Sequence, residues 1–122
     1  MENNSSSKPL LLDISQNSSS LHIAPAIYVR ILQKAVEQTS QDIKEIESAL
    51  PVSDYEKMQT ISHKLKGDYD NLRITMLSLL AKQINDMAKA QQDSERIVML
   101  LDEFVAYFEQ LKQIVAKAKV SG

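Results

Sequence analysis

The chain has 122 residues, a length that supports one domain with a single hydrophobic core. Apolar residues make up 43% of the chain and charged residues 25%, and the net charge of −2 disfavours a nucleic-acid-binding surface. Cysteine is absent, so disulfides, thiolate metal sites and a cysteine nucleophile are excluded.

Residues 1 to 20 are rich in Ser and Asn and are expected to form a flexible N-terminal arm. The arm contains one apolar patch, Leu10 to Leu12, which would allow it to pack on the rest of the chain as a short helical lead-in. The main domain is therefore placed at residues 21 to 122.

Apolar residues recur at helical spacing in four later segments. Helices are expected over residues 25–50, 53–71, 74–92 and 94–118. Ser53, followed three residues later by Glu56, has the pattern of a capping box, and Asp93 or Ser94 is expected to cap the last helix. No segment alternates with period two, so strands are not expected. Short connections predict an all-α fold, an up-down antiparallel four-helix bundle.

The second helix carries a histidine on its polar face. Thr60, His63, Lys66, Gly67 and Asp70 share this face, opposite the apolar stripe, so the imidazole is expected to face water. A neutral ring nitrogen beside an ammonium group and a residue without a side chain combines a nucleophile, a phosphate-attracting cation and an open approach. This combination favours a phosphohistidine.

Plainer interpretations exist for each of these residues. A helical histidine is most often a surface residue without a role, and Lys66 could be a solvated charge. Gly67 could allow a neighbouring helix to pack closely, or it could begin the end of the helix. However, glycine inside a helix costs about 1 kcal/mol relative to alanine, which favours a functional reason for it.

The run Ser62-His63-Lys64-Leu65-Lys66-Gly67, with the apolar residues that follow it, resembles the signature of histidine-containing phosphotransfer (HPt) domains. These modules pass a phosphoryl group between the receiver domains of multistep two-component pathways. The resemblance covers roughly residues 20 to 118, including the order of the helices. It implies that His63 accepts the phosphoryl group, that Lys66 stabilises it and that Gly67 leaves access to it.

Further residues are expected to support this site. Gln59 and Thr60 would hydrogen-bond to the imidazole or flank it, and Gln83 and Asn85 on the next helix would orient it. Lys64 would lie at the edge of the docking surface, and Asp70 would repel an acidic partner surface or pair with a basic one. His22 lies outside any matching pattern and receives no role.

Four positions depart from the usual HPt pattern. The family usually has small residues after the Lys-Gly pair and a later glycine, whereas this chain has Asp68, Tyr69 and Asp70, with Arg73 at the glycine position. Tyr69 falls on the apolar stripe, so its ring is expected in the core with the hydroxyl near the rim. Asp70 suggests an altered preference for partners.

The predicted function is a phosphorelay intermediate that takes a phosphoryl group from a receiver aspartate and passes it to another receiver. No nucleotide, cofactor or metal motif is visible, so the chain would be a phosphocarrier rather than an ATP-using enzyme, with magnesium supplied by the receiver. The partners would be receivers of a response regulator or hybrid sensor kinase. The alternative is a docking module that carries no phosphate.

Two further expectations concern the state of the protein. No apolar run reaches the roughly 20 residues that span a bilayer and no leader pattern is present, so we expect a cytoplasmic protein without membrane contact. No heptad repeat is sustained, which disfavours a coiled-coil assembly and favours a monomer.

Overall fold

The computed structural model describes residues 8–92 and 94–121, which form five helices and, within these ranges, no strand. The helices are α1 (Ile14–Ser20), α2 (Pro25–Ala49), α3 (Tyr55–Asn71), α4 (Thr75–Ala90) and α5 (Ser94–Ser121). The predicted all-helical fold is therefore confirmed. Across these two ranges, no helix is long and apolar enough to cross a membrane.

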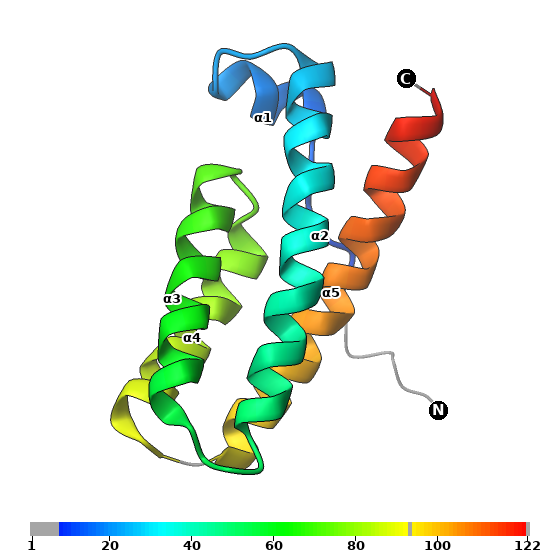
Figure 1. Ribbon diagram of the computed structural model, residues 1–122. Coiled ribbons are helices and arrows are strands. Elements are labelled where there is room, and N and C mark those ends of the chain that lie inside the picture. The colour runs from blue at the N-terminus through cyan, green and yellow to red at the C-terminus, as the bar shows by residue number, and fades with distance from the viewer. Residues whose placement is uncertain (1–7, 93, 122) are drawn as a thin grey trace.

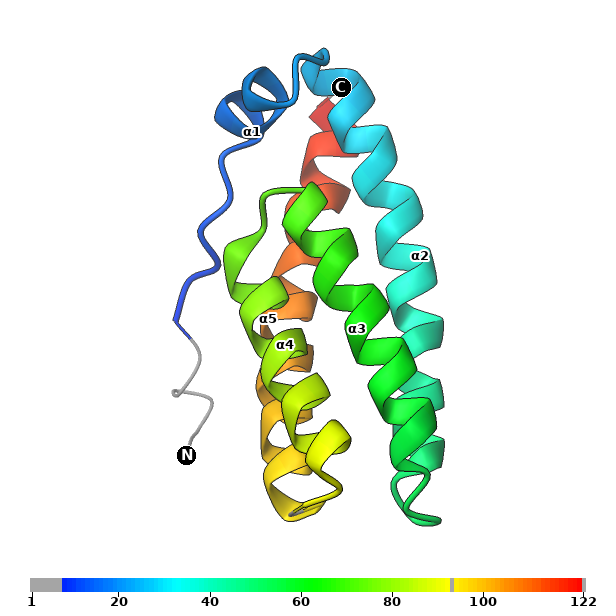
Figure 2. The same ribbon diagram turned by 90° about the vertical axis from the view of Figure 1, so that its left-hand side faces the viewer.

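The four longer helices lie side by side around one hydrophobic core (Figures 1 and 2). α3 and α4 are the shorter pair, and α2 and α5 extend past them toward the end where α1 lies (Figure 1). Four aromatic side chains are fully buried: Tyr28, Tyr69, Phe104 and Phe108. Tyr69 of α3 packs edge-to-face on Phe104 of α5, with ring centroids 6.2 Å apart, so the inner face of α3 is fixed against the core.

The described part of the N-terminal segment lies on the bundle (Figure 2). Leu10 is only 7% exposed, and its main-chain nitrogen donates to Gln110 Oε1 at 2.7 Å. α1 follows, and the Asp13 side chain caps it by accepting from the nitrogen of Gln16. Residues 8–13 thus lie against the bundle, and α1 forms a short helical lead-in to α2. The expected arm's first seven residues lie outside the described ranges.

The turn between α3 and α4 explains one departure from the family pattern. Arg73 has a φ of 65°, in the left-handed region that favours glycine, and a residue with a Cβ is strained there by roughly 1–2 kcal/mol. Neighbouring groups hold it in place: Arg73 Nε donates to Ser20 Oγ at 3.3 Å, and its carbonyl accepts from Asn17 Nδ2 at 3.4 Å. The lead-in helix α1 therefore supports the turn that follows α3.

The start of α3 differs from the sequence prediction. Ser53 does not cap the helix, because its φ of 54° places it in the preceding turn. The cap is Asp54, whose side chain accepts from the nitrogen of Lys57 at 3.1 Å. For α5, the alternative cap Asp93 lies outside the described residues.

Candidate functional site

His63 lies in the middle of α3 with its side chain exposed. The opposite face of the helix is buried in the core through Met58, Ile61, Leu65 and Tyr69. This division follows from the 3.6-residue period of the apolar positions, which leaves His63 on the solvent side. An imidazole in this position is open to attack by, or on, a group carried by another molecule.

Gly67 lies one turn after His63 and adds open space beside it. A Cβ built at Gly67 would meet nothing within 4 Å, and α3 continues to Asn71. The two plain interpretations of this glycine, a close approach of another helix and the end of α3, are therefore not supported. No positive φ requires glycine here either.

Lys66 is held by a carboxylate of its own helix. Its Nζ lies 3.1 Å from Asp70 Oδ2, and both side chains are partly exposed. The other oxygen of Asp70 accepts a short hydrogen bond from Ser78 Oγ of α4, and that hydroxyl also lies 3.2 Å from the Lys66 carbonyl. The Ser78 hydrogen bond, followed by that of Lys66, lowers the pKa of the Asp70 carboxyl. The Lys66 ammonium is thus paired before any phosphoryl group arrives.

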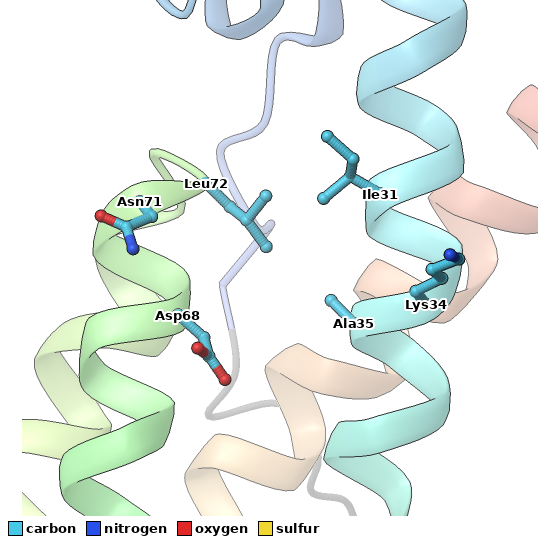
Figure 3. A pocket seen from close by; sticks show the side chains of 6 residues that line it. All are labelled: Ile31, Lys34, Ala35, Asp68, Asn71 and Leu72. Atoms are coloured by element: carbon cyan, nitrogen blue, oxygen red, sulfur yellow. The ribbon is translucent and has the colours of Figure 1, made fainter.

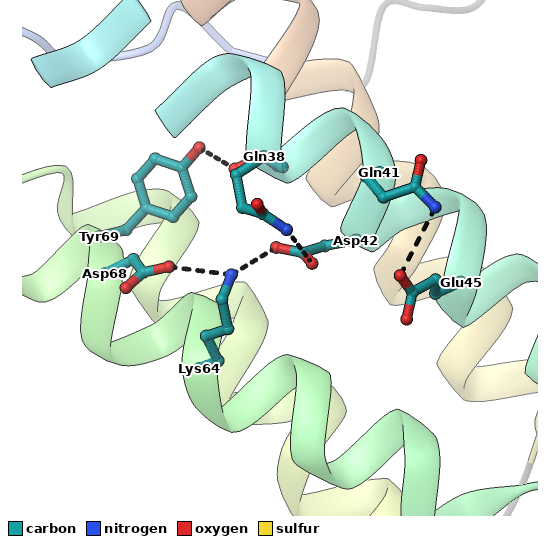
Figure 4. A network of polar contacts seen from close by, with 8 residues as sticks. Gln38, Gln41, Asp42, Glu45, Lys64, Asp68 and Tyr69 are labelled. Carbon is teal, nitrogen blue, oxygen red and sulfur yellow. Dashed lines mark hydrogen bonds and ion pairs between the residues drawn. The ribbon is translucent and has the colours of Figure 1, made fainter. Parts of the chain in front are cut away.

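Lys64 points away from this group, toward α2 (Figure 4). Its Nζ lies 2.7 Å from Asp42 Oδ2 and 3.3 Å from Asp68 Oδ2. Asp42 is almost fully buried and also accepts from Gln38 Nε2 at 3.1 Å. Partial burial acts to lower the pKa of Lys64, but the hydrogen bonds and charges of the two carboxylates outweigh it and raise the pKa. Lys64 thus ties α3 to α2, and its expected place at the edge of a docking surface stays a prediction.

Tyr69 completes the contact between α3 and α2. Its hydroxyl forms a 2.6 Å hydrogen bond with Thr39 Oγ1, and both side chains are buried. The expectation that this hydroxyl lies near the rim is wrong, because Thr39 provides a buried partner inside the interface. Burial raises the pKa of Tyr69 to about 12, although the hydrogen bond with Thr39 acts to lower it.

The remaining predicted residues lie around α3 without a contact that would orient His63. Asn85 Nδ2 of α4 donates to the main-chain carbonyl of Gln59 at 2.9 Å, so it supports the turn of α3 that precedes His63. Thr60 Oγ1 donates to the Glu56 carbonyl of its own helix at 3.0 Å. Gln83 is exposed on α4.

A surface hollow lies between α2 and α3 (Figure 3). Its lining consists of Ile31, Lys34, Ala35, Asp68, Asn71 and Leu72. His63 is not among these residues, so this hollow is separate from the site. Within the described ranges, no three His, Asp or Glu side chains are grouped closely enough to hold a metal ion.

Sequence reasoning missed two side chains near the lysines: Asp42, which binds Lys64, and Ser78, which binds the Asp70 carboxylate that pairs with Lys66. Asp42 and Ser78 are both polar residues on otherwise apolar stripes, beside Ile43 in α2 and Leu77 in α4. A buried polar residue needs a partner, and that mismatch was the available signal. Their partners could not be identified without the relative rotation of the helices.

The helices, the exposed histidine and the adjacent lysine and glycine define a phosphotransfer type of helical domain. A model of the Hpt domain family matches residues 30–117, most of the chain. The chain therefore belongs to the Hpt domain family, whose members are phosphocarriers of two-component signalling that interact with receiver domains. Searches of curated proteins and of solved structures found no match.

Proposed function

We propose that this chain is a phosphorelay intermediate in which His63 accepts a phosphoryl group from a receiver aspartyl phosphate and passes it to a second receiver. The observation that carries the proposal is the exposure of His63 on the solvent face of α3, within the range that matches the family. Lys66 and Gly67, one turn further along the same face, supply a cation and an open approach.

In the first step, one nitrogen of the His63 ring attacks the phosphorus of the acyl phosphate. A P–N bond forms, the P–O bond to the receiver carboxylate breaks, and the carboxylate leaves with the electron pair. The other ring nitrogen keeps its proton, so the phosphorylated ring carries a positive charge. In the second step, the carboxylate of another receiver attacks the phosphorus and the electron pair of the P–N bond returns to the ring.

The chain's own contribution is position and charge. His63 projects from a helix whose inner face is locked in the core, which fixes the direction of attack. Lys66 places an ammonium group one turn away, where it can neutralise phosphoryl oxygens. We expect the receiver to supply magnesium and the groups that activate its aspartate, because they belong to the site of the acyl phosphate.

We further infer that α2 to α5 form the expected up-down antiparallel bundle and that the protein acts as a monomer in the cytoplasm. The short connections between successive long helices support the first inference.

The competing interpretation, docking without phosphate, rests on Asp68, Tyr69 and Asp70, which depart from the family pattern. Both carboxylates are paired with lysines of α3, at 3.3 Å and 3.1 Å. Pairing with Lys64 and Lys66 gives these residues an intramolecular role and weakens their value as evidence for a site that has lost its chemistry.

The proposal is tested by labelling the parent protein and His63→Gln. Each protein is labelled in two separate reactions. One contains ³²P-labelled phosphoramidate, and the other contains a receiver domain that was charged with ³²P from acetyl phosphate. We expect acid-labile, base-stable label in the parent alone, with equal melting temperatures because His63 is exposed. Label on His63→Gln would overturn the assignment, and receiver binding without labelling of the parent would support the docking module.

A further inference from the structure

Lys66, Asp70 and Ser78 form a closed set of contacts that joins α3 to α4. One oxygen of the Asp70 carboxylate binds the Lys66 ammonium at 3.1 Å, and the other accepts from Ser78 Oγ. The same hydroxyl lies 3.2 Å from the Lys66 carbonyl. Asp70 therefore keeps a partner on α4 even when its contact with Lys66 is broken.

Lys66 lies between His63, which would carry the phosphoryl group, and the carboxylate of Asp70. Lys66 follows His63 by about 4.5 Å along the helix axis and precedes Asp70 by about 6 Å, and all three residues lie on one face. A flexible four-carbon stem lets its ammonium group turn toward either neighbour. A phosphoryl group on His63 would carry close to two negative charges, against one on Asp70.

The exposure of the pair of Lys66 and Asp70 also affects whether Lys66 can change partners. The side chains of Lys66 and Asp70 are 37% and 53% exposed, so water can replace either partner at small cost. The pair of Lys64 with Asp42 offers a contrast, because the Asp42 side chain is only 6% exposed and has little access to water. Of the two lysines that follow His63 on α3, only Lys66 is thus arranged to exchange partners.

We propose that Asp70 is a positioning residue that competes with the phosphoryl group of His63 for the Lys66 ammonium, and that Ser78 retains Asp70 when Lys66 leaves it. This inference rests on the proposed function of His63. In the unphosphorylated chain, Asp70 pairs with Lys66 on the exposed face of α3. In the phosphorylated chain, Lys66 turns to the phosphoryl oxygens, but the waiting carboxylate weakens that contact and keeps the group ready for transfer.

The competition can be measured directly on the phosphorylated protein. The parent, Asp70→Asn, Lys66→Met and the double variant are phosphorylated with phosphoramidate, and the pKa of the phosphorylated His63 ring is read by ³¹P NMR. A neighbouring ammonium group disfavours the ring cation and lowers this pKa. Asp70→Asn keeps an oxygen for Ser78 but releases Lys66, so we expect the pKa of the phosphorylated ring to fall by roughly 0.2 to 0.7 pH unit, the range of an exposed ion pair.

Two comparisons separate competition from simple charge repulsion. In the Lys66→Met background, Asp70→Asn should leave the pKa of the phosphorylated ring unchanged, because the ammonium group for which Asp70 and the phosphoryl group compete is gone. Asp68→Asn removes a carboxylate of α3 that binds Lys64 instead, at 3.3 Å, and should also leave it unchanged. A receiver transfer assay adds a second readout: Asp70→Asn should shift the equilibrium toward phosphorylated His63 by about 1.5- to 5-fold.

The outcomes distinguish a failure of this inference from a failure of the proposed function. The competition would be overturned if the effect of Asp70→Asn persisted without Lys66. It would also be overturned if phosphoramidate labelled the parent but Asp70→Asn left the pKa unchanged. Either result would leave the function of His63 intact. Failure of phosphoramidate to label His63 in the parent would overturn the proposed function and this inference together. A fall in the pKa of the phosphorylated ring that requires Lys66 would support both.

Discussion

Two lysines of α3 lie two residues apart and differ in what binds them. Lys64 turns toward α2, where the carboxylate of Asp42 is almost completely buried (Figure 4). Lys66 turns along the exposed face, where the carboxylate of Asp70 is half exposed. The depth of the carboxylate, rather than the distance across the pair, separates a structural contact from one that can be exchanged.

The same division applies to the two faces of α3. The face toward α2 carries Lys64 and Tyr69, whose polar groups find partners inside the interface. The solvent face carries His63 and Lys66, together with a glycine that leaves space beside them. Changes on the first face should alter stability, and changes on the second should alter phosphoryl transfer.

The largest effect is expected from Tyr69→Phe in alkali. The unfolded chain releases the tyrosine proton near pH 10.0, whereas the folded protein keeps it until about pH 12 because the ring is buried. This contribution to stability is complete below pH 10 and is lost as pH rises toward 12, by roughly 3 kcal/mol. Tyr69→Phe should remove that part of the alkaline loss, measured as the free energy of unfolding against pH.

Thr39→Val sharpens this test. The hydrogen bond between Thr39 and Tyr69 acts to lower the pKa of Tyr69. Without this hydrogen bond, Tyr69 should lose its proton at still higher pH. Identical alkaline profiles for the parent and Tyr69→Phe would contradict the assignment of this pH dependence to the α2–α3 face.

A pair of matched substitutions tests the two lysines themselves. Lys64→Met keeps most of the side-chain volume but leaves the buried Asp42 carboxylate with fewer partners, which should destabilise the fold by about 1–3 kcal/mol. Lys66→Met should change stability by no more than about 0.5 kcal/mol and should instead slow phosphoryl transfer. Urea denaturation and a receiver transfer assay on both variants would measure this; equal losses of stability would contradict the comparison.

A smaller gain in stability is expected at Gly67. Because an added Cβ meets nothing within 4 Å, Gly67→Ala should stabilise α3 by up to about 1 kcal/mol. Gly67→Leu should fold as well but place a bulky side chain one turn from His63, weakening receiver docking and transfer. Thermal melts and transfer rates measured on the same samples would show this. Transfer at the parent rate by Gly67→Leu would mean that the open space beside His63 has no role in access.

Much of the fold followed from periodicity, because the core accepts apolar residues at helical spacing and the solvent face accepts polar ones. The same pattern predicted that His63 would be exposed. The cap of α3 was misplaced by one residue, because the left-handed conformation of Ser53 depends on the geometry of the turn.

The partners of the polar groups were beyond the sequence. Lys64 binds Asp42 from 22 positions away, and Ser78 binds Asp70 across the α3–α4 turn, and both contacts depend on how the helices are rotated. The positive φ of Arg73 was also beyond the sequence. It is supported by contacts with α1, in a segment that was expected to be a flexible arm or a short helical lead-in.

The smallest effect expected concerns which neighbour controls Asp70. The hydrogen bond from Ser78 is the larger cause of its lowered pKa, and the pair with Lys66 is the smaller one. The stabilising contribution of such a carboxylate is present above its unfolded pKa and is lost as pH falls through its folded pKa. Ser78→Ala should therefore raise the pKa of Asp70 toward its ordinary value by more than Lys66→Met does, as measured by NMR titration of the side-chain carboxyl carbon. If Lys66→Met had the greater effect, Asp70 would be held mainly by the lysine, and Ser78 could not retain it when Lys66 turns to the phosphoryl group.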